Sequence, residues 1–202
     1  MLNNYVLRSI RYMLDLSDAQ MVNIVKLADL TISKEDMVSW LKKDTDPEYI
    51  ECNDNVMGHF LNGLIYYRRG KDESRPAPEI DTRLNNNIIL KKLRVAFELK
   101  DTDMIEIYQL ADFRVSKPEL NAIFRKPGHK NYRECGDQLL RYFLKVSQRV
   151  FEAINSLYQW LFFNLSFYTL LTIVYNKQDK CQEVFNEKLY SSTPNPTRHA
   201  TF

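Results

Sequence analysis

The sequence contains the segment PEYIECNDNVMGHFL at residues 47–61 and, 83 positions later, the segment KNYRECGDQLLRYFL at residues 130–144. Tyr, Glu, Cys and Asp stand at the same offsets in both segments, and both end on Phe-Leu. The same shift aligns residues 3–63 with residues 86–146 without a gap, and 20 of the 61 aligned pairs are identical. An ungapped alignment of that length with this many identities does not arise by chance, so the pattern predicts two tandem copies of one folding unit.

Each copy is predicted to form four amphipathic helices. Only five glycines occur in 202 residues, which disfavours a turn-rich β fold. Apolar residues recur at the three- and four-residue spacing of a buried helix face. In the second copy these stripes are Ile89, Leu93, Ala96 and Phe97; Met104, Ile107, Tyr108 and Ala111; Leu120, Ile123 and Phe124; and Leu139, Leu140, Phe143 and Leu144.

Polar residues mark the expected helix starts. Ser33 precedes Asp36, and Ser116 precedes Glu119, by the three residues that form a capping box. Pro118 fits a first helical turn, where its missing N–H costs little. Recurring aspartates are expected to cap other helices by accepting backbone N–H bonds, namely Asp18, Asp54, Asp101 and Asp137.

The predicted fold class is all-α, with two tandem copies of a four-helix unit packed as a pseudo-two-fold pair and an apolar C-terminal helix. A unit of 61 residues is marginal alone, so the copies should share a core. The charged, proline-containing segment RGKDESRPAPEID reads as an extended connector. The predicted organisation is a first helical repeat at 1–70, a linker at 71–84, a second helical repeat at 85–149, an apolar C-terminal helix at 150–176, and a mostly disordered tail at 177–202.

The charge is distributed unevenly between the copies. The chain has a net charge of +2, yet residues 2–70 carry 8 Lys/Arg against 10 Asp/Glu, a net −2, and residues 83–149 carry 14 against 8, a net +6. A nucleic-acid face is therefore expected on the second copy, while an ordinary solvated helix surface explains the same charges.

Residues 103–126 suggest a helix-turn-helix, although the turn lacks the usual glycine. Its last helix would present four candidate binding residues to DNA: Lys117, Asn121, Arg125 and Lys126.

An alternative hypothesis is that residues 129–137 form an enzyme active site or a small-molecule site. His129 and Cys135 could act as base and nucleophile, but Asp46 replaces the histidine in the first copy, and a buried cysteine is more often a small apolar residue. We predict no catalytic residue, no metal ligand and no cofactor. The candidate binding residues of this segment are His129, Lys130, Tyr132 and Arg133.

Two further sets of polar residues recur in both copies. Asn86 and Asn87 match Asn3 and Asn4; one of each pair is expected to cap a helix, and the other could touch a ligand or the opposite copy. Arg11 and Arg94 are expected to form ion pairs between helices with Asp29 and Asp112, respectively, rather than phosphate contacts.

The C-terminal part contains 24 uncharged positions at residues 153–176, long enough to cross a bilayer, with Asn164 near the middle. A membrane span and a helix that folds back on the repeats both fit, and the second is favoured. The first residues lack a secretory signal, so a cytoplasmic location is expected.

Four strings carry a resemblance to a known family: NNNIILKKLRVAFELK, FRVSKPELNAIFRKPGHKNYRECGDQLLRYFL, FLNGLIY and RGKDES. They resemble the YehS-like bacterial family, a domain of unknown function present in two copies per chain. The resemblance covers about residues 1–148 and implies a tandem all-helical cytoplasmic protein without catalytic residues to carry over. Residues 150–202 depart from the family pattern.

These observations favour a non-enzymatic binding or regulatory module. Nucleic acid bound through the basic second repeat is the leading partner, and a protein partner is the other possibility. The alternatives are an enzyme or small-molecule binder that uses residues 129–137, and a membrane-tethered adaptor that uses residues 153–176.

Overall fold

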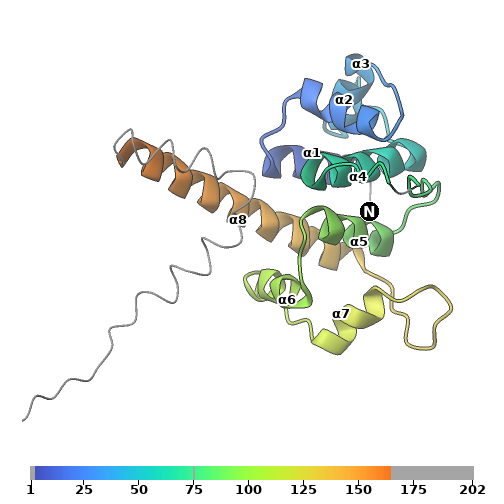
Figure 1. Ribbon diagram of the computed structural model, residues 1–202, viewed down its shortest axis with the longest axis vertical. Coiled ribbons are helices and arrows are strands. Elements are labelled where there is room, and N and C mark those ends of the chain that lie inside the picture. The colour runs from blue at the N-terminus through green and yellow to red at the C-terminus, as the bar shows by residue number, and fades with distance from the viewer. Residues whose placement is uncertain (1–2, 75, 165–202) are drawn as a thin grey trace, which may run out of the picture. The chain divides into compact units, whose positions relative to one another are not determined.

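The computed structural model describes residues 3–74 and 76–164, with side chains as far as Phe151. Every regular element in these ranges is a helix, which confirms the all-α prediction. The chain forms two compact units, and the first ends at Ala153. The aligned residues of both repeats, 3–63 and 86–146, lie within this first unit (Figure 1).

The helices of the two repeats correspond one to one. Each helix of the second repeat begins 83 positions after its counterpart in the first, as the sequence alignment predicts. The first repeat contains α1 (Asn3–Met13), α2 (Asp18–Leu27), α3 (Lys34–Leu41) and α4 (Asp54–Arg69), and the second contains α5 (Asn86–Ala96), α6 (Asp101–Gln109), α7 (Lys117–Ile123) and α8 (Asp137–Asn164).

The turns between helices recur as well. Asp29 and Asp112 have backbone φ angles of 65° and 54°, in the left-handed region that non-glycine residues adopt rarely. Aspartate tolerates this conformation, so Asp112 adopts the left-handed backbone for which a helix-turn-helix usually has a glycine. Asp15 and Glu98 form a second such pair, with φ angles of 49° and 55°.

The capping boxes at Ser33 and Ser116 are confirmed, since each serine accepts the N–H three residues on and the acidic side chain there accepts the serine N–H. The prediction for the aspartates is wrong. Asp18 and Asp54 are the first residues of their helices, and the caps are Ser17 and Asn53, one position earlier. A carboxylate in the first turn instead stabilises the helix through its dipole.

The recurring arginines form ion pairs, but with other partners than predicted. Arg11 binds Asp18 at 2.8 Å, and Arg94 binds Asp101 at 2.7 Å. Each arginine also donates its Nε–H to a backbone carbonyl of the turn that follows its helix. Each guanidinium therefore holds the tight turn after its helix, and it also binds the aspartate that begins the next helix.

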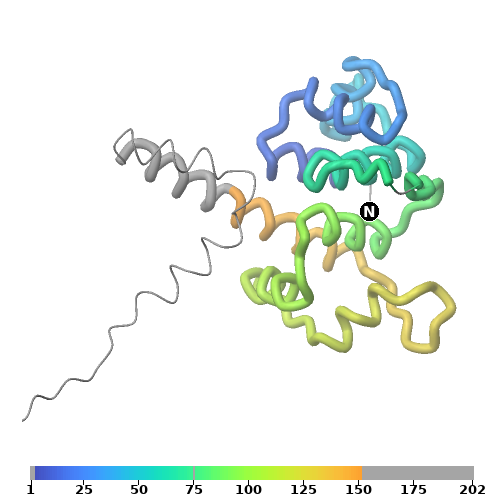
Figure 2. The backbone as a smooth tube through the Cα atoms, viewed as in Figure 1, coloured from blue at the N-terminus to red at the C-terminus, as the bar shows by residue number. Residues whose placement is uncertain are grey.

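The buried apolar side chains of both repeats belong to one continuous core, as expected for units too small to fold alone. α4 lies along α5 at the junction of the repeats (Figure 2). Phe60 and Phe143, an identical pair in the alignment, are both fully buried. The second half of the linker is tied to this junction, because Asp81 binds Lys92 at 2.8 Å and the Pro78 carbonyl accepts a hydrogen bond from Asn62.

α8 extends the fourth helix of the second repeat past residue 149 to Asn164. The remainder of the predicted apolar helix, residues 165–176, and the predicted disordered tail at 177–202 lie outside the described residues. Among the helices that the structure describes, none is both long and apolar enough to cross a membrane.

The two repeats differ in how closely their second and fourth helices approach. A Cβ atom at Gly63 of α4 would lie 1.8 Å from the carbonyl oxygen of Ile24 in α2, so only glycine permits this approach. The alignment places Val146 at the corresponding position of α8.

We expect Gly63→Ala to lower the free energy of unfolding by about 3 kcal/mol, since the methyl group forces two helix backbones apart. Urea denaturation followed by circular dichroism measures the change. Gly136→Ala is the control, because nothing lies within 4 Å of a Cβ there. Equal stability of the two variants would contradict the close approach.

Tyr108 gives the second repeat a buried hydroxyl at a position where the first repeat has an apolar side chain. Tyr108 is fully buried, its position is Val25 in the first repeat, and its hydroxyl has no hydrogen-bond partner among the described residues. Burial accordingly raises the pKa of Tyr108 far above its usual range.

Tyr108→Phe is expected to raise the free energy of unfolding by about 1 kcal/mol, because it removes a buried polar group that bonds nothing. Tyr142→Phe serves as the control: its hydroxyl accepts a hydrogen bond from Gln138 near the surface. A loss of stability in Tyr108→Phe would show that the hydroxyl has a partner.

Candidate functional site

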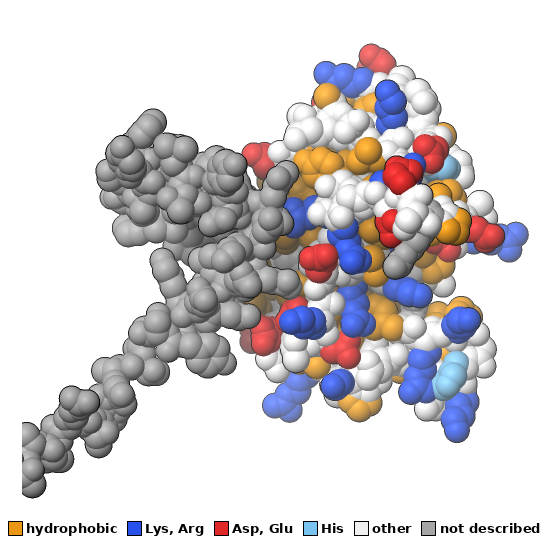
Figure 3. Space-filling view, in the orientation of Figure 1, with side chains coloured by type: hydrophobic (Ala, Val, Ile, Leu, Met, Phe, Trp, Pro, Cys, Tyr) orange, Lys and Arg blue, Asp and Glu red, His pale blue; other side chains and the backbone are white. Residues whose placement is uncertain are grey.

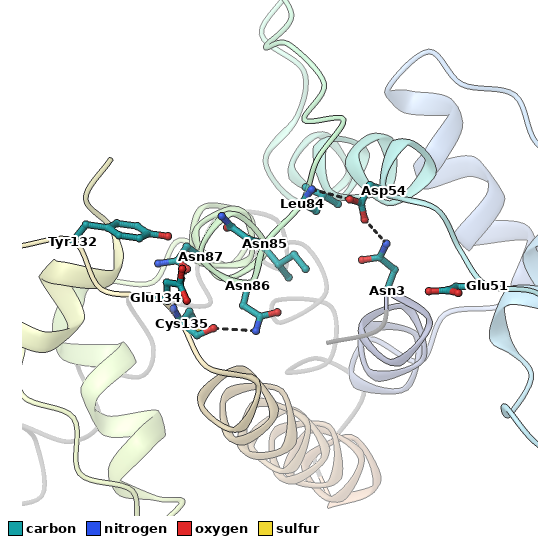
Figure 4. A pocket seen from close by; sticks show the side chains of 11 residues that line it. Asn3, Glu51, Asp54, Leu84, Asn85, Asn86, Asn87, Tyr132, Glu134 and Cys135 are labelled. Atoms are coloured by element: carbon teal, nitrogen blue, oxygen red, sulfur yellow. Dashed lines mark hydrogen bonds between the residues drawn. The ribbon is translucent and has the colours of Figure 1, made fainter. Parts of the chain in front are cut away.

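A groove of about 410 Å³ opens where the repeats meet. Residues from the start of α1 and the end of the loop before α4 form one side, and the loop before α8 forms the other (Figure 4). The first residue of α4, the start of α5 and the two residues before α5 complete the lining. The lining residues are Asn3, Glu51, Asp54, Leu84, Asn85, Asn86, Asn87, Ile89, Tyr132, Glu134 and Cys135.

Asn87 holds the loop before α8 against α5. Its side-chain N–H groups donate to the carbonyls of Ile123 and Arg133, and its oxygen accepts the N–H of Cys135, all at 2.8–2.9 Å. Asn4 makes the same three bonds in the first repeat, to Trp40, Ile50 and Cys52. We call each set of three bonds an asparagine clamp.

Asn86 supports the clamp from the neighbouring position. It donates to the carbonyl of Cys135 at 2.9 Å and to the Asp137 carboxylate at 2.7 Å. Asn3 repeats this arrangement with Cys52 and Asp54, at 3.0 and 2.8 Å.

The prediction that one asparagine of each pair caps a helix is therefore wrong. The α5 cap is Asn85, whose side chain accepts the Ile88 N–H at 2.9 Å. Both the amide N–H groups and the oxygen of the Asn87 side chain bond the backbone in the clamp, so the role of Asn87 is structural. Asn86 keeps one carbonyl oxygen that no described residue binds.

The polar groups of the groove that no described residue binds include more acceptors than donors; the donors are the side-chain amide of Asn85, which uses only its oxygen internally, and the Tyr132 hydroxyl. Asn3 and Asn86 use their amide N–H groups internally and leave their oxygens, and Glu51 and Glu134 are exposed carboxylates without an ion-pair partner among the described residues. Glu51 and Glu134 are an identical pair in the alignment, as are Asn3 and Asn86. The sequence showed that these residues recur but not that they face one groove.

The thiols of Cys52 and Cys135 are buried in the core, as the apolar interpretation of the cysteines predicts. Burial raises the pKa of each thiol to about 12, with a smaller contribution from nearby carboxylates. A thiol in this state is protonated at neutral pH and is a weak nucleophile. No described contact joins His129 to Cys135, and no three His, Cys, Asp or Glu side chains of the described residues form a metal cluster.

The loop at residues 125–134, here called the basic loop, contains most of the predicted binding residues. Arg125 lies against the exposed His129 ring, with 3.1 Å between Nη1 and Nδ1, and the same ring nitrogen accepts the Asn131 N–H. The Tyr132 N–H donates to the His129 carbonyl, and the Arg133 N–H donates to Ala122 in α7. These bonds order the loop backbone while Lys126 and Lys130 stay exposed.

The helix-turn-helix prediction misplaced part of this surface. α7 ends at Ile123, so Lys117 and Asn121 lie on the helix, while Arg125 and Lys126 lie on the loop that follows. At seven residues α7 is about 10 Å long, with a seven-residue connection before it, in place of the short turn of that motif.

The fold is that of a helical protein with two copies of one unit, and the comparisons with known proteins show that both copies belong to one domain family. A family model described as protein of unknown function (DUF1456) matches residues 3–70 and again residues 86–148, and the chain belongs to this family. The chain is 51% identical over 145 residues to the uncharacterized protein YehS of Escherichia coli (strain K12), an alignment that covers 72% of this chain and 93% of that protein. The expected resemblance is thus confirmed. No solved structure matches the chain.

Asn87→Ala is expected to lower the free energy of unfolding by about 3 kcal/mol, because three backbone groups lose their partners and two of these bonds are buried. Asn4→Ala should cost about the same, since the clamp is duplicated. The exposed Asn121→Ala is the control and should change stability by less than about 0.5 kcal/mol in urea denaturation. A clamp variant as stable as the control would assign Asn87 to ligand binding instead.

Proposed function

We propose that the protein is a non-enzymatic nucleic-acid-binding module that contacts phosphates with the basic loop and the exposed face of α7. The observation that carries this proposal is a reversal of charge at one place in the duplicated fold. The basic loop has four Lys/Arg and one Glu, a net +3, whereas its counterpart at residues 42–51 has two Lys and four Asp/Glu, a net −2.

The reversal comes from the loss of neutralising carboxylates. In the first repeat Lys42 forms ion pairs with Asp46 and Glu48, and the hydrogen bond to Glu48 raises the pKa of the lysine. The corresponding positions in the basic loop are His129 and Asn131. Arg125, which replaces Lys42, therefore has no carboxylate partner among the described residues.

Most cations of this surface are available to a ligand. Lys117, Lys126 and Lys130 are exposed and form no ion pair within the described part of the chain. Arg133 is the exception, since it binds Glu119 at 2.7 Å. Hydrogen bonds from Ser116 and Arg133 lower the pKa of Glu119 to about 2, so that pair persists at neutral pH. Lys and Arg side chains gather over this end of the second repeat (Figure 3).

Phosphates are the ligands that such a surface suits. Exposed like charges held on an ordered loop repel one another, and a polyanion relieves this repulsion while releasing its own counterions. Asn121 stands one helical turn after Lys117 on α7, where its amide can donate to a phosphate or sugar oxygen. The acidic first repeat orients the molecule, because it is repelled by the same polyanion.

The proposal includes a pseudo-two-fold arrangement of the repeats. Helices that recur at a constant offset and duplicated asparagine clamps support equivalent folds for the two units, and the α4–α5 contact supplies a shared junction. In this arrangement one unit serves as the scaffold and the other as the binding unit. A cytoplasmic location, where DNA and RNA are accessible, fits this role.

The double variant Lys126→Glu/Lys130→Glu should bind labelled mixed-sequence DNA and RNA at least about tenfold more weakly at low salt, and its plot of log affinity against log salt should be shallower by about 1–2. Fluorescence anisotropy over a salt series measures both quantities.

The matched control is Lys26→Glu/Lys43→Glu, which makes the same charge change at exposed lysines of the first repeat, Lys43 being the aligned counterpart of Lys126. The control should stay within about twofold of the natural protein. No binding by the natural protein at low salt, or equal losses in both double variants, would refute the proposed surface.

A further inference from the structure

The basic loop and the groove are continuous. Tyr132 and Glu134 belong to the basic loop and also line the groove, and Lys130 precedes the tyrosine by two residues. Two residues of chain span at most about 7 Å, so a phosphate held by Lys130 lies within one nucleotide of the groove mouth. A strand that binds the loop therefore passes the groove.

Tyr132 contributes an aromatic ring to the lining of the groove. Its ring is half-buried, and no aromatic ring or cation of the described residues stacks on it. In Figure 4 it stands with Glu134 on one side of the groove, facing Glu51, Asp54 and Asn3 on the other. Leu84 and Ile89 add apolar surface to the lining. A planar ring stacked on Tyr132 would thus have polar groups opposite its edge.

Free acceptors outnumber free donors in the groove, so a ligand that presents hydrogen-bond donors is favoured. The oxygens of Asn3 and Asn86 and the carboxylates of Glu51 and Glu134 accept hydrogen bonds, as described above. Base edges that carry amino groups, those of cytosine, adenine and guanine, match this set, while uracil and thymine offer a single ring N–H. The same carboxylates repel phosphate, so the strand backbone stays on the basic loop.

We propose that the groove receives one unstacked, amino-bearing nucleobase, so that the ligand is a single strand of RNA or DNA rather than a duplex. This inference rests on the proposed function and adds the substrate class. A base paired in a duplex has its Watson–Crick edge occupied and its faces stacked, so it cannot enter. A volume of about 410 Å³ lies within the range of small-molecule sites.

The test uses fluorescein-labelled oligocytidine and oligouridine single strands of equal length and a duplex of the same length, with the full chain at low salt. The natural protein should bind the cytidine strand at least about fivefold more tightly than the uridine strand, and the duplex less tightly than either. Tyr132→Ala should weaken both single strands about tenfold, whereas Tyr132→Phe, which keeps the stacking face, should not. Tyr49→Ala, at the aligned position outside the groove, is the matched control.

Glu134→Ala separates base recognition from general charge effects. Removal of a carboxylate should raise the affinity for every strand, so the readout is the ratio of cytidine to uridine affinity, which should fall toward one. The urea midpoint of each variant verifies that the fold is intact.

The outcomes distinguish the two proposals. If the duplex binds as tightly as the single strands and Tyr132→Ala matches Tyr49→Ala, the base site is refuted, while the basic-loop proposal stands as long as Lys126→Glu/Lys130→Glu still weakens binding. If no strand binds the natural protein, both proposals fall.

Discussion

Asn4 and Asn87 each use both groups of the side-chain amide to bind three backbone groups that lie 36 to 48 residues further along the chain. One of the three belongs to the third helix of the repeat, and two belong to the loop before its fourth helix. Each clamp therefore joins the first helix of a repeat to the end of its third helix and to the loop before its fourth helix. Two of the three bonds in each clamp are buried, where water does not compete and where an unpaired backbone group is destabilising, and the third is part-buried. The position of both loops, and therefore of the groove between them, depends on these bonds.

The same frame carries two different surfaces. The clamps, the buried cysteines and the buried phenylalanines are shared by both repeats, because each is fixed by contacts inside the fold. Exposed loop positions have no such constraint, and there the repeats diverge in charge. Asp46 and Glu48 neutralise the loop of the first repeat, and His129 and Asn131 leave its counterpart basic. Duplication thus supplies a scaffold whose second copy is free to acquire a ligand.

Much of the fold could be predicted because the signals are local. Apolar spacing located the helices, and capping boxes marked two of their starts, since these patterns act within one or two helical turns. The roles of the recurring polar residues were harder to predict. The sequence predicts that the arginines pair with Asp29 and Asp112, whereas in the structure their partners begin the next helix. It also predicts that one asparagine of each pair is a helix cap, whereas the cap of α5 is the preceding residue. The recurrence of a residue shows that it matters in both copies without showing what it touches.

Residue identity and spacing along the chain are enough to predict the duplication, its register, the helical class and which repeat carries the positive charge. Three features are visible only in the folded chain: Asn87 bonds the backbone of a distant loop, α7 ends before Arg125, and Tyr132 and Glu134 face Glu51 and Asn3 across a groove. Those facts depend on which distant segments meet, and that is set by packing of the shared core rather than by any local pattern.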